Sequence, residues 1–511
     1  MEKEPRHWVE ILAEKVVSEK KEPFIITSGM TTSGPLHAGT LCEFLFPSAI
    51  ENYLKNEGHK TEFHFIADIL DAFDSIPTNF SKYEKELSPY LGRPLSDIPD
   101  PLGCCNSFGE HFLNEAKEVM EEVGVHPILE KANDLYNQGK FDYYARLFLK
   151  NFEEAKKVVF ESSLRQTLPK DWNPIMPICQ NCGRVATTVV AESDESSYSY
   201  EDGRDVKYTK GCGYEGENKI SDHKYKLTWR LHWPSWMDVF KTSIEGAGMD
   251  HHTKGGSWDT AVAAHKKLFK KEPPIGYKFG FVLLHGKKYS KSKGIGLGIK
   301  DILELVPPEL VKYSLLRPDI QENKDIDPTG YNLMRLFDEF SVASKIDINS
   351  KEISRADRKK AIAFSLSTKR INWGASFADL LMYYQLYKDW GKVGEILNDK
   401  KGVGYLKPYI EKWIEEEFAP EEYSFSFKPT KISENQEAVL AFANRLKKDM
   451  KAVEIHNLVF EIAKENNIEA NELFTSLYKA LIGKEKGPRM GKLIEAVGTD
   501  KIKETLLGMI R

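Results

Sequence analysis

Residues 34–40 read GPLHAGT and stand between a predicted buried strand and a predicted helix. A helix N-terminus offers unpaired N–H groups and a partial positive charge, which suit phosphate groups. His37 can donate a hydrogen bond to a phosphate oxygen, and Gly39 allows close approach of a backbone or ligand. Thr40 is expected to cap the helix. The stretch predicts a nucleotide phosphate site, although a capped loop with a surface histidine would read the same way.

A second stretch, KYSKSKG at residues 288–294, combines ammonium groups, hydroxyls and a flanking glycine. Lys288, Ser290, Lys291 and Ser292 suit a loop that closes on a polyphosphate and neutralises the charge that develops during nucleotidyl transfer. A solvated basic loop is the alternative interpretation. Taken together, the two stretches are far more specific than either one alone.

The elements needed to position these residues are present around the first stretch. An apolar run at 23–30 predicts a strand, residues 41–58 have helical spacing that stops at Gly58, and residues 61–68 predict a second strand. Strand, glycine-rich loop, helix and strand form a βαβ unit, which implies a parallel sheet with helices on its faces. Several helical patterns follow over 108–165.

The sequence changes character at 171–228, where Pro, Gly, Cys and short alternating runs predict a small hairpin-rich insertion. An α/β pattern returns from 229 to about 300, with a helix near 258–271 and a strand at 278–286. Beyond about residue 305 nearly all patterns are helical. The expected fold is a Rossmann-type parallel-sheet catalytic domain, split by the insertion and followed by an all-α region. The expected divisions are 1–170, 171–228, 229–320 and 321–511.

Composition sets limits on the function. With 511 residues, 41% hydrophobic and 11% aromatic, the chain can bury several cores. Its net charge of −5 argues against a sequence-blind nucleic-acid coat, but a local basic patch can still bind one RNA. The N-terminus predicts a charged amphipathic helix, not a signal peptide, and no run of 18 apolar residues predicts a membrane span. Six cysteines are too few for a disulfide scaffold, so the cytoplasm is the expected compartment.

The pair of stretches resembles the signatures of class I aminoacyl-tRNA synthetases. His37-Ala38-Gly39-Thr40 is similar to their HIGH motif, and the five residues from Lys288 to Ser292 are similar to KMSKS. Ala38 and Thr40 depart from the ideal letters, as does Tyr289, whereas the histidine, glycine, serine and second lysine are kept. The intervening insertion also fits this family.

The lysine-specific branch of class I is the most similar. The resemblance covers most of the chain and is strongest in one passage, residues 91–111. The matching passages are Thr27-Ser28-Gly29, DILDAFDSIP at 68–77, LGRPLSDIPDPLG at 91–103 with SFGEH at 107–111, WRLHWP at 229–234, GMDH at 248–251 with GGS at 255–257, and Phe474, Tyr478 and Gly487-Pro488-Arg489. Two positions depart from the branch: His232 stands where an Asp is common, and Met249 where a Lys is common.

This resemblance implies the reaction and its partners: ATP with Mg²⁺ activates L-lysine to lysyl-adenylate, and the lysyl group passes to the 3′ end of tRNA(Lys). It implies that the insertion meets the acceptor end and that the helical region receives the anticodon. The implied site residues are His37, Ser290 and Lys291 for catalysis; Gly39, Thr40, Asp250, His251, Lys288 and Ser292 for ATP; and Ser28, Gly29, Glu43 and Tyr277 for lysine. From the residues alone, Glu43 can pair with a substrate ammonium or serve as a first-turn acid. Tyr277 can likewise be a plain core aromatic.

Cys179-x-x-Cys182 and Cys212 form three quarters of a zinc-knuckle pattern. No cysteine stands at the places just before Cys212, which are Thr209 and Lys210. The fourth ligand is therefore open, with His223 a candidate, unless packing alone holds these hairpins together. Cys42, Cys104 and Cys105 are expected to be buried or incidental.

Two other functions stay open. A class I synthetase for another amino acid shares the fold, but Glu43 would repel an acidic substrate. A catalytically weak paralogue that binds tRNA is the other alternative, favoured by Met249, His232 and the incomplete cysteine set.

Overall fold

The computed structural model describes residues 6–164, 167–284, 287–288, 298–350, 352–368 and 373–510. Its internal contacts divide the chain into two compact units. The first contains Met1–Ile302, Val311–Ile326 and Asp347–Ser367, and the second contains Leu303–Leu310, Asp327–Ile346 and Thr368–Arg511. The finer divisions drawn from the sequence stay predictions.

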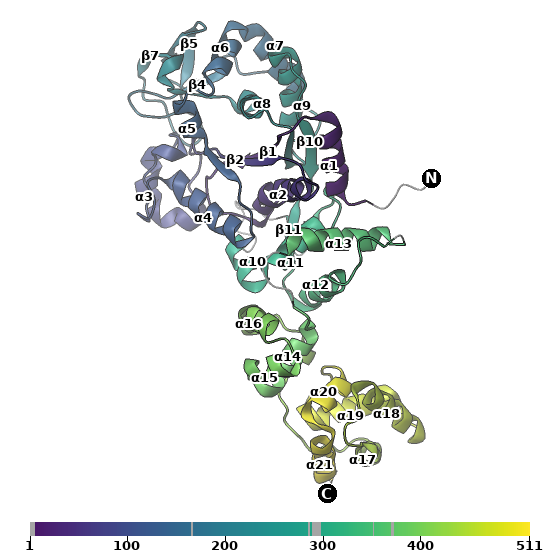
Figure 1. Ribbon diagram of the computed structural model, residues 1–511. Coiled ribbons are helices and arrows are strands. Elements are labelled where there is room, and N and C mark those ends of the chain that lie inside the picture. The colour runs from purple at the N-terminus through teal and green to yellow at the C-terminus, as the bar shows by residue number, and fades with distance from the viewer. Residues whose placement is uncertain are drawn as a thin grey trace. The chain divides into compact units, whose positions relative to one another are not determined.

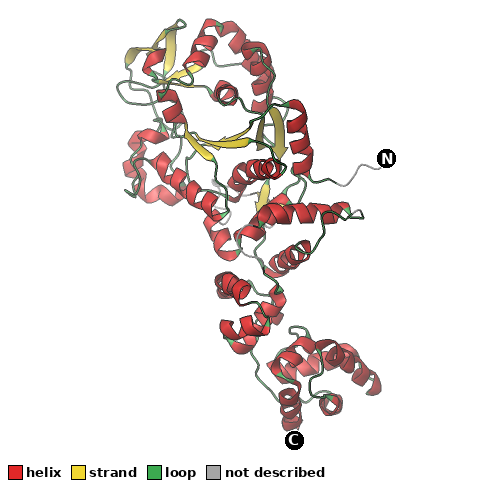
Figure 2. Ribbon diagram, in the orientation of Figure 1, coloured by secondary structure: helices red, strands yellow, loops and turns green. Residues whose placement is uncertain are grey.

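A five-stranded parallel sheet lies at the centre of the first unit (Figures 1 and 2). Its order is β10-β9-β1-β2-β3, with β1 Phe24–Met30, β2 Thr61–Ala67, β3 Ile128–Lys131, β9 Ile244–Gly248 and β10 Ile275–Phe279. The chain starts in the middle with β1, adds β2 and β3 on one side, and later adds β9 and β10 on the other. The strand order therefore reverses between β1 and β9. In open parallel sheets, the carboxyl ends of the strands at such a reversal leave a crevice that binds ligands.

The strand–loop–helix–strand unit predicted at the N-terminal end is confirmed. β1 is an almost completely buried apolar strand, and α2 (Leu41–Asn56) follows it and packs against β1, β2 and β9. The helix ends before Gly58, which has a φ of +91°, a backbone conformation that favours glycine. α1 (Trp8–Glu19) packs in turn on α2.

Tryptophan side chains cover the opposite face of the sheet. A Cβ on Gly29 would clash with the carbonyl oxygen of Ile66 and lie 3.2 Å from Trp236 of α8 (Trp229–Val239). A Cβ on Gly276 would overlap the indole of Trp258 in α9 (Ser257–Ala264). Glycine at both positions therefore lets the indoles pack directly on the sheet.

Two strand predictions need correction. The stretch 278–286, predicted as one strand, contains the end of β10 and then β11 (Val282–Leu284), which pairs with β12 (Lys287–Lys288) and β13 (Lys324–Asp325) in a separate small sheet. Gly280 separates the two strands, because its backbone passes against the carbonyl of Glu322 too closely for any side chain. β3 was not predicted from the sequence. It is only four residues long and lies between two helices, so it shows no alternation of apolar and polar residues that would indicate a strand.

Helices and a small β subdomain complete the first unit. The helices between β2 and the subdomain are α3 Glu84–Leu87, α4 Phe108–Glu122, α5 Ala132–Asn137, α6 Asp142–Lys150 and α7 Phe152–Ser163. The subdomain strands are β4 Ile175–Pro177, β5 Val189–Ser193, β6 Ser197–Glu201, β7 Glu215–Lys219 and β8 Tyr225–Leu227. β5, β6 and β7 form an antiparallel sheet, and β4 pairs with β8. The predicted hairpin-rich insertion is confirmed.

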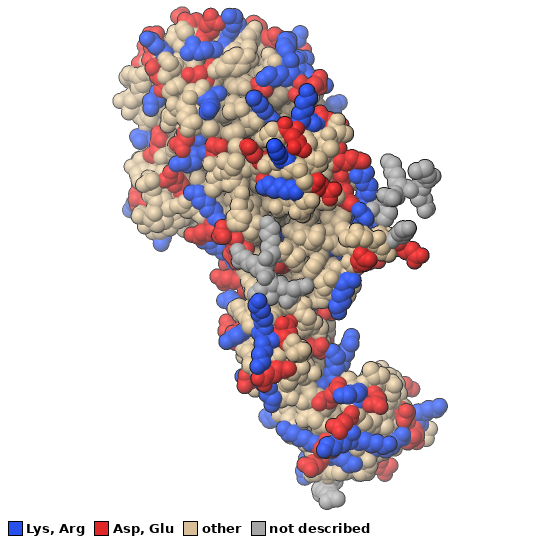
Figure 3. Space-filling view, in the orientation of Figure 1, with Lys and Arg blue, Asp and Glu red and all other residues tan. Residues whose placement is uncertain are grey.

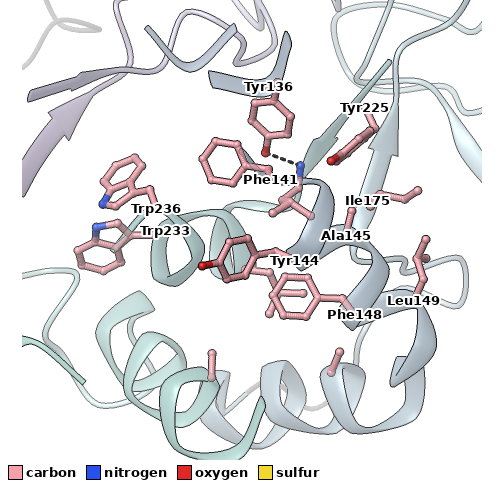
Figure 4. Packing of buried hydrophobic residues seen from close by; sticks show 14 of the residues in the cluster. Tyr136, Phe141, Tyr144, Ala145, Phe148, Leu149, Ile175, Tyr225, Trp233 and Trp236 are labelled. Carbon is pink, nitrogen blue, oxygen red and sulfur yellow. Dashed lines mark hydrogen bonds between the residues drawn. The ribbon is translucent and has the colours of Figure 1, made fainter. Parts of the chain in front are cut away.

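One apolar cluster connects the insertion to the five-stranded sheet (Figure 4). Tyr225 of β8 and Ile175 of β4 pack with Tyr136 and Phe141 from the helical segment and with Trp236 of α8. The Tyr136 hydroxyl accepts a hydrogen bond from the backbone N–H of Leu227 at 2.8 Å, which fixes β8 against α5. The insertion is thus held by a continuous core and not only by its two connecting chains.

The second unit is helical, as predicted for the C-terminal region. Its helices are α12 Gly330–Ala343, α14 Phe377–Tyr387, α15 Trp390–Ile396, α16 Lys400–Glu415, α17 Gln436–Arg445, α18 Ala452–Glu465, α19 Ala470–Ile482, α20 Met490–Val497 and α21 Thr499–Ile510. α10 Ile299–Leu305 and α11 Pro308–Leu316 are each divided between the two units, and α13 Arg355–Ser367 belongs to the first unit. The predicted fold class, a Rossmann-type sheet split by a small insertion and followed by an all-α region, is confirmed.

Acidic and basic side chains are interspersed on the face that Figure 3 shows, without a continuous basic coat. Among the helices that the structure describes, none is long and apolar enough to cross a membrane.

Candidate active site

The carboxyl end of β1 opens into a small hollow at the reversal of the strand order. Its volume is about 190 Å³. It is lined by Met30, Thr31, Gly34, Leu36, His37, Gly39, Thr40 and Glu43. The hollow thus brings together four of the residues predicted from the sequence: the histidine, glycine and threonine of the loop, and the glutamate of the helix.

The loop around His37 turns directly into α2. His37 is extended, with φ −115° and ψ 161°, and is followed by a 3-10 turn over Ala38–Thr40. A Cβ on Gly39 would lie 3.0 Å from Nδ1 of His37, so glycine allows the imidazole to fold over the turn. The predicted cap at Thr40 is wrong: its backbone is already helical and its side chain makes no capping hydrogen bond, because the 3-10 turn continues into the helix.

Glu43 lies in the first turn of α2 with its carboxylate toward the end of β1. The Ser28 hydroxyl donates to its Oε2 at 2.9 Å. Burial raises the pKa of Glu43 to about 8, Ser28 opposes this, and Asp250 adds to it. Without a ligand the carboxyl is therefore held mainly neutral near pH 7, and a cation placed beside it would restore its charge.

Tyr277 is buried in β10, with its ring against Gly246 of β9, where any side chain would overlap it. Among the described residues its hydroxyl has no hydrogen-bond partner. Burial raises the pKa of Tyr277 well above its usual value, and the carboxylates of Glu43 and Glu245 add to this, so the group stays a phenol. A buried phenol without a partner is uncommon and suits a site completed by a ligand.

Glu245 was not singled out from the sequence. It is almost completely buried in β9, accepts a hydrogen bond from Nε1 of Trp233 at 2.9 Å, and also accepts from the Thr27 hydroxyl. Burial raises the pKa of Glu245 to about 8, and the neighbouring Glu43 adds to this. The available signal was a lone acid inside a strand that is otherwise apolar.

Asp250 and His251 follow β9 on the other side of the reversal. The His251 ring lies 5.7 Å from that of Trp233 and 6.2 Å from that of Trp229, centroid to centroid. These two residues therefore stand at the crevice, and their assignment to ATP stays a prediction. Ser290, Lys291 and Ser292 lie outside the described residues, as does the side chain of Lys288, so the basic loop also stays a prediction.

A buried ion cluster connects this crevice to the insertion. Lys226 of β8 donates to Oδ2 of Asp68 and to Oδ1 of Asp71, both at 2.8 Å, and the Thr31 hydroxyl at the hollow donates to Asp71 at 3.2 Å. His232 is fully buried with Nδ1 3.6 Å from Asp68. Burial would raise the pKa of Asp68, but Lys226 and His232 outweigh it and hold the carboxyl well below its usual range. The imidazole of His232 in α8 thus faces the aspartate that directly follows β2.

The three knuckle cysteines meet, and Asp202 joins them. The ligand atoms of Cys179, Cys182, Asp202 and Cys212 all lie within 4.8 Å of one another. The Sγ atoms of Cys179 and Cys212 are 3.7 Å apart, close to the roughly 3.8 Å that two thiolates span on one tetrahedral zinc. Oδ1 of Asp202 is buried and has no hydrogen-bond partner among the described residues. The donor set therefore fits zinc.

The candidate fourth ligand, His223, lies outside this cluster of ligand atoms. His223 pairs instead with Asp142 at 3.0 Å, and Thr209 forms a short backbone bridge with Val206. Sequence reasoning could not find Asp202, because an aspartate 20 residues from a cysteine carries no spacing signal.

A second group that can hold a metal was also missed. Asp100, Cys104, Cys105 and His111 place their ligand atoms within 4.8 Å of one another. Sγ of Cys104 lies 3.3 Å from Sγ of Cys105 and 3.2 Å from Nδ1 of His111. Cys104 is exposed and Cys105 is half-buried, so of the three cysteines expected to be buried or incidental only Cys42 is buried. The Asp-x3-Cys-Cys-x5-His spacing was the available signal.

A parallel sheet with a glycine–histidine loop at the helix N-terminus beside its reversal defines an ATP- or nucleotide-binding α/β enzyme. A family model described as tRNA synthetases class I (K) matches residues 6–370, and one described as anticodon binding domain matches residues 406–507. The chain belongs to the class I (K) family of tRNA synthetases.

Curated relatives match nearly the whole chain. The lysine–tRNA ligase of Archaeoglobus fulgidus is 31% identical, over 98% of this chain and 99% of that protein. The lysine–tRNA ligase of Methanocaldococcus jannaschii is also 31% identical, over 97% and 98%. That of Pyrococcus horikoshii is 29% identical, over 96% and 97%.

Proposed function

We propose that this chain is a lysine–tRNA ligase, which activates L-lysine with ATP and transfers the lysyl group to the 3′ end of tRNA(Lys). The observation that carries the lysine specificity is the Glu43 carboxyl, held by Ser28 in a hollow that it shares with His37. The nearly full-length similarity to lysine–tRNA ligases and the anticodon-domain match support the reaction and its partners.

The amine end of the substrate would be recognised by a carboxylate and a phenol. A lysine ammonium carries three donors and prefers a carboxylate partner. Glu43 supplies that carboxylate, and the buried hydroxyl of Tyr277 supplies an acceptor that has no protein partner among the described residues. The aliphatic stem would lie along the ring of Tyr277. Ser28 and Gly29, at the end of β1, would shape the floor of this pocket.

In the first step, a carboxylate oxygen of lysine attacks the α-phosphorus of ATP, the Pα–O–Pβ bond breaks, and pyrophosphate leaves. His37, at the N-terminus of α2, would donate to the phosphate oxygens, and Ser290 and Lys291 would neutralise the leaving charge. Gly39, Thr40, Lys288 and Ser292 would line the phosphate path, with Asp250 and His251 on the nucleoside side. No protein nucleophile is needed, because positioning and electrostatics lower this barrier.

Magnesium would neutralise charge on the phosphates of ATP. Among the described residues, no three His, Cys, Asp or Glu side chains converge at the hollow, so ATP oxygens would supply most of the ligands.

In the second step, the 2′-hydroxyl of the terminal adenosine attacks the lysyl carbonyl, and AMP leaves. We assign the acceptor end of tRNA to the insertion at 171–228 and the anticodon to the helical region at 321–511. Such an enzyme works where charged tRNA is used in protein synthesis, so we place it in the cytoplasm.

Zinc would stabilise the two segments that contain clustered cysteines, which are the insertion and the segment leading into α4. Cys179, Cys182, Asp202 and Cys212 would hold one ion in the insertion, and Asp100, Cys104, Cys105 and His111 a second ion beside α4. Both sets have four ligands and no open position, which is typical of structural and not catalytic zinc.

A catalytically weak tRNA-binding paralogue is the second candidate, favoured by Met249 in place of a basic residue near the nucleotide. Charging of unfractionated tRNA with labelled lysine tests the proposal. Lysyl-tRNA formation supports the ligase, and tRNA binding without charging would favour the paralogue.

A further inference from the structure

Lys324 of β13 is a buried lysine to which the proposed reaction gives no role. Its exposed fraction is 2%. Its ammonium donates to three backbone carbonyls, those of Asp319 at 3.2 Å, Ile320 at 2.5 Å and Glu322 at 2.6 Å. An ammonium carries three donors, so these carbonyls use all of them. A buried lysine is usually paired with a carboxylate, whereas this one fixes the turn that joins α11 to β13 through main-chain oxygens.

The turn that Lys324 fixes is packed against the junction of β10 and β11. The backbone N–H of Gly280 donates to the carbonyl of Ile320 at 3.0 Å, and any side chain at Gly280 would overlap the carbonyl of Glu322. The backbone N–H of Lys324 donates to the carbonyl of Phe281 at 2.9 Å. The turn therefore determines where the chain leaves β10 and enters β11.

The other side of Lys324 contacts α2. Its ammonium lies 5.2 Å from the centroid of the Phe46 ring, a distance typical of a cation–π interaction. The ring of Phe46 lies in turn 5.3 Å from that of Phe279, the last residue of β10. Burial lowers the pKa of Lys324 to about 8, and Cys42 of α2 opposes this. Near pH 7 the side chain therefore stays an ammonium and keeps its three donors.

These contacts lie beside the proposed amine pocket. Glu43 and Phe46 are three residues apart on α2, so they lie on one face of the helix. Tyr277 and Phe279 are two residues apart on β10, so they point to the same side of the sheet. Burial and then the charge of Glu43 raise the pKa of Tyr277, and Phe46 packs on Phe279. Two neighbouring interactions thus join α2 to β10, and the group that fixes the second also fixes the span of the first.

We propose that Lys324 is a positioning residue for amino-acid selection, because it sets the separation of α2 and β10 and thereby the length of the amine that fits between Glu43 and Tyr277. The inference rests on the proposed function. A carboxylate distinguishes charged from uncharged side chains, but only geometry distinguishes two ammonium groups on chains of different length. A displacement of about 1 Å in such a site can cost roughly 100-fold in rate.

A purely structural lysine would behave differently. Its replacement would lower the melting temperature without changing which amine the site prefers. The preference for lysine over ornithine, whose side chain is one methylene shorter, therefore separates the two roles.

The test is ATP–pyrophosphate exchange by the full chain with L-lysine and L-ornithine, with tRNA present. Lys324→Met keeps the length of the side chain but leaves three carbonyls without a donor, so the turn is expected to shift. The KM for lysine should rise at least about ten-fold, and the KM for ATP should change less than about three-fold. The ratio of kcat/KM for lysine to that for ornithine should fall at least about five-fold.

Lys20→Met is the matched control. Lys20 also donates to a backbone carbonyl, that of Pro273 at 2.8 Å, but this carbonyl precedes β10. Both KM values and the lysine-to-ornithine ratio should therefore match those of the unmodified chain.

Phe46→Leu is a second variant, in which Lys324 keeps its three carbonyls and only the ring between it and Phe279 is lost. A smaller fall in the lysine-to-ornithine ratio is expected. If circular dichroism shows that Lys324→Met does not fold, Phe46→Leu decides the question.

An unchanged lysine KM and ratio in folded Lys324→Met would overturn the inference, as would unchanged values in Phe46→Leu where the first variant does not fold. Equal increases in the KM for lysine and for ATP would also overturn it, in favour of a general loss of structure. Absence of lysine-dependent exchange by the unmodified chain would instead contradict the proposed function, and this inference with it.

Discussion

At the scale of single residues, the site depends on a carboxyl that is costly to ionise until a cation arrives. Glu43 is close to Asp250 and Glu245, and only Ser28 donates to it among the hydrogen bonds that the described residues make. Such a group discriminates by charge, because an uncharged side chain in the pocket leaves the carboxyl either protonated or unpaired. It would likewise reject glutamate and aspartate, which would bring another negative charge.

Replacing Glu43 with Gln should raise the KM for lysine at least about 100-fold, since a charge-assisted bond to a partly desolvated carboxylate contributes roughly 3 kcal/mol. The KM for ATP should change less than about three-fold. Steady-state exchange kinetics measure both constants. Glu62→Gln, an exposed glutamate on β2, is the control. Equal increases in both KM values would contradict the assignment.

Lysine binding should also weaken as the pH falls below about 8, the pKa of Glu43 in the empty pocket. The substrate ammonium stays charged over this range, so the groups that titrate near the amine are the carboxyls of Glu43 and the neighbouring Glu245. Protons compete with lysine for Glu43, and the Kd measured by calorimetry should rise by up to about ten-fold per pH unit. The Glu43→Gln variant should show a flatter profile, because only Glu245 then titrates beside the amine. A flat profile in the unmodified chain would mean that this carboxyl is already ionised.

The same pKa has a consequence for stability. A carboxyl whose pKa is higher in the folded than in the unfolded chain stabilises the fold at low pH. That contribution is lost as the pH rises from the ordinary glutamate pKa toward about 8. Without ligand, Glu43→Gln should therefore melt at a higher temperature than the unmodified chain at about pH 8, and the difference should shrink near pH 5. Thermal melts at the two pH values test this, and a variant that is less stable at pH 8 would contradict it.

At the scale of elements, features that depend on neighbouring residues in the sequence were predictable, and features that depend on contacts between distant segments were not. The loop from Gly34 to Thr40, α2 and the flanking strands were predicted, because their periodicity and glycines are local. The insertion was predicted from its hairpin pattern. Asp202 and Glu245 were not predicted as site residues, because each contacts its partners only when distant segments of the chain pack together. The division of 278–286 into β10 and β11 depends on a backbone contact with Glu322, which no local pattern encodes.

The insertion carries a metal-capable cluster, and so does the helical segment before it. We expect about two zinc ions per chain by elemental analysis, since both sets offer four ligands. Cys182→Ser and Cys104→Ser should each remove about one. Cys42→Ser, at a buried cysteine outside both clusters, should remove none. Unchanged zinc in both ligand variants would rule out these sites.

The ion cluster under the hollow should be important for stability. Lys226 has a side chain that is 4% exposed and is shared by Asp68 and Asp71. Lys226→Met should lower the free energy of unfolding of the first unit by about 3–5 kcal/mol, because Asp68 would be left buried without its cation. Urea unfolding measures this. The double variant with Asp68→Asn should recover part of the loss, whereas no recovery would mean that packing and not charge is responsible.

At the scale of the whole molecule, the two units divide the work of one ligase between chemistry and recognition. The first unit carries the crevice, and the second carries the anticodon-domain match. Neither the crevice nor the region of the anticodon-domain match requires a chain that is basic overall. Acidic and basic residues are accordingly mixed on the face that Figure 3 shows. The fold class and the reaction were predictable from the sequence, because two motifs and one distinctive passage between residues 34 and 294 match the same family.

The most direct test of the central claim is ATP–pyrophosphate exchange with each of the twenty amino acids. Transfer RNA should be present in the assay, so that an enzyme that needs it to complete the pocket is also detected. The account predicts exchange that depends on lysine and falls to background with the other nineteen. Exchange with a different amino acid would contradict the pocket built on Glu43 and Tyr277. Exchange with none, from a folded chain that binds tRNA, would contradict the ligase itself.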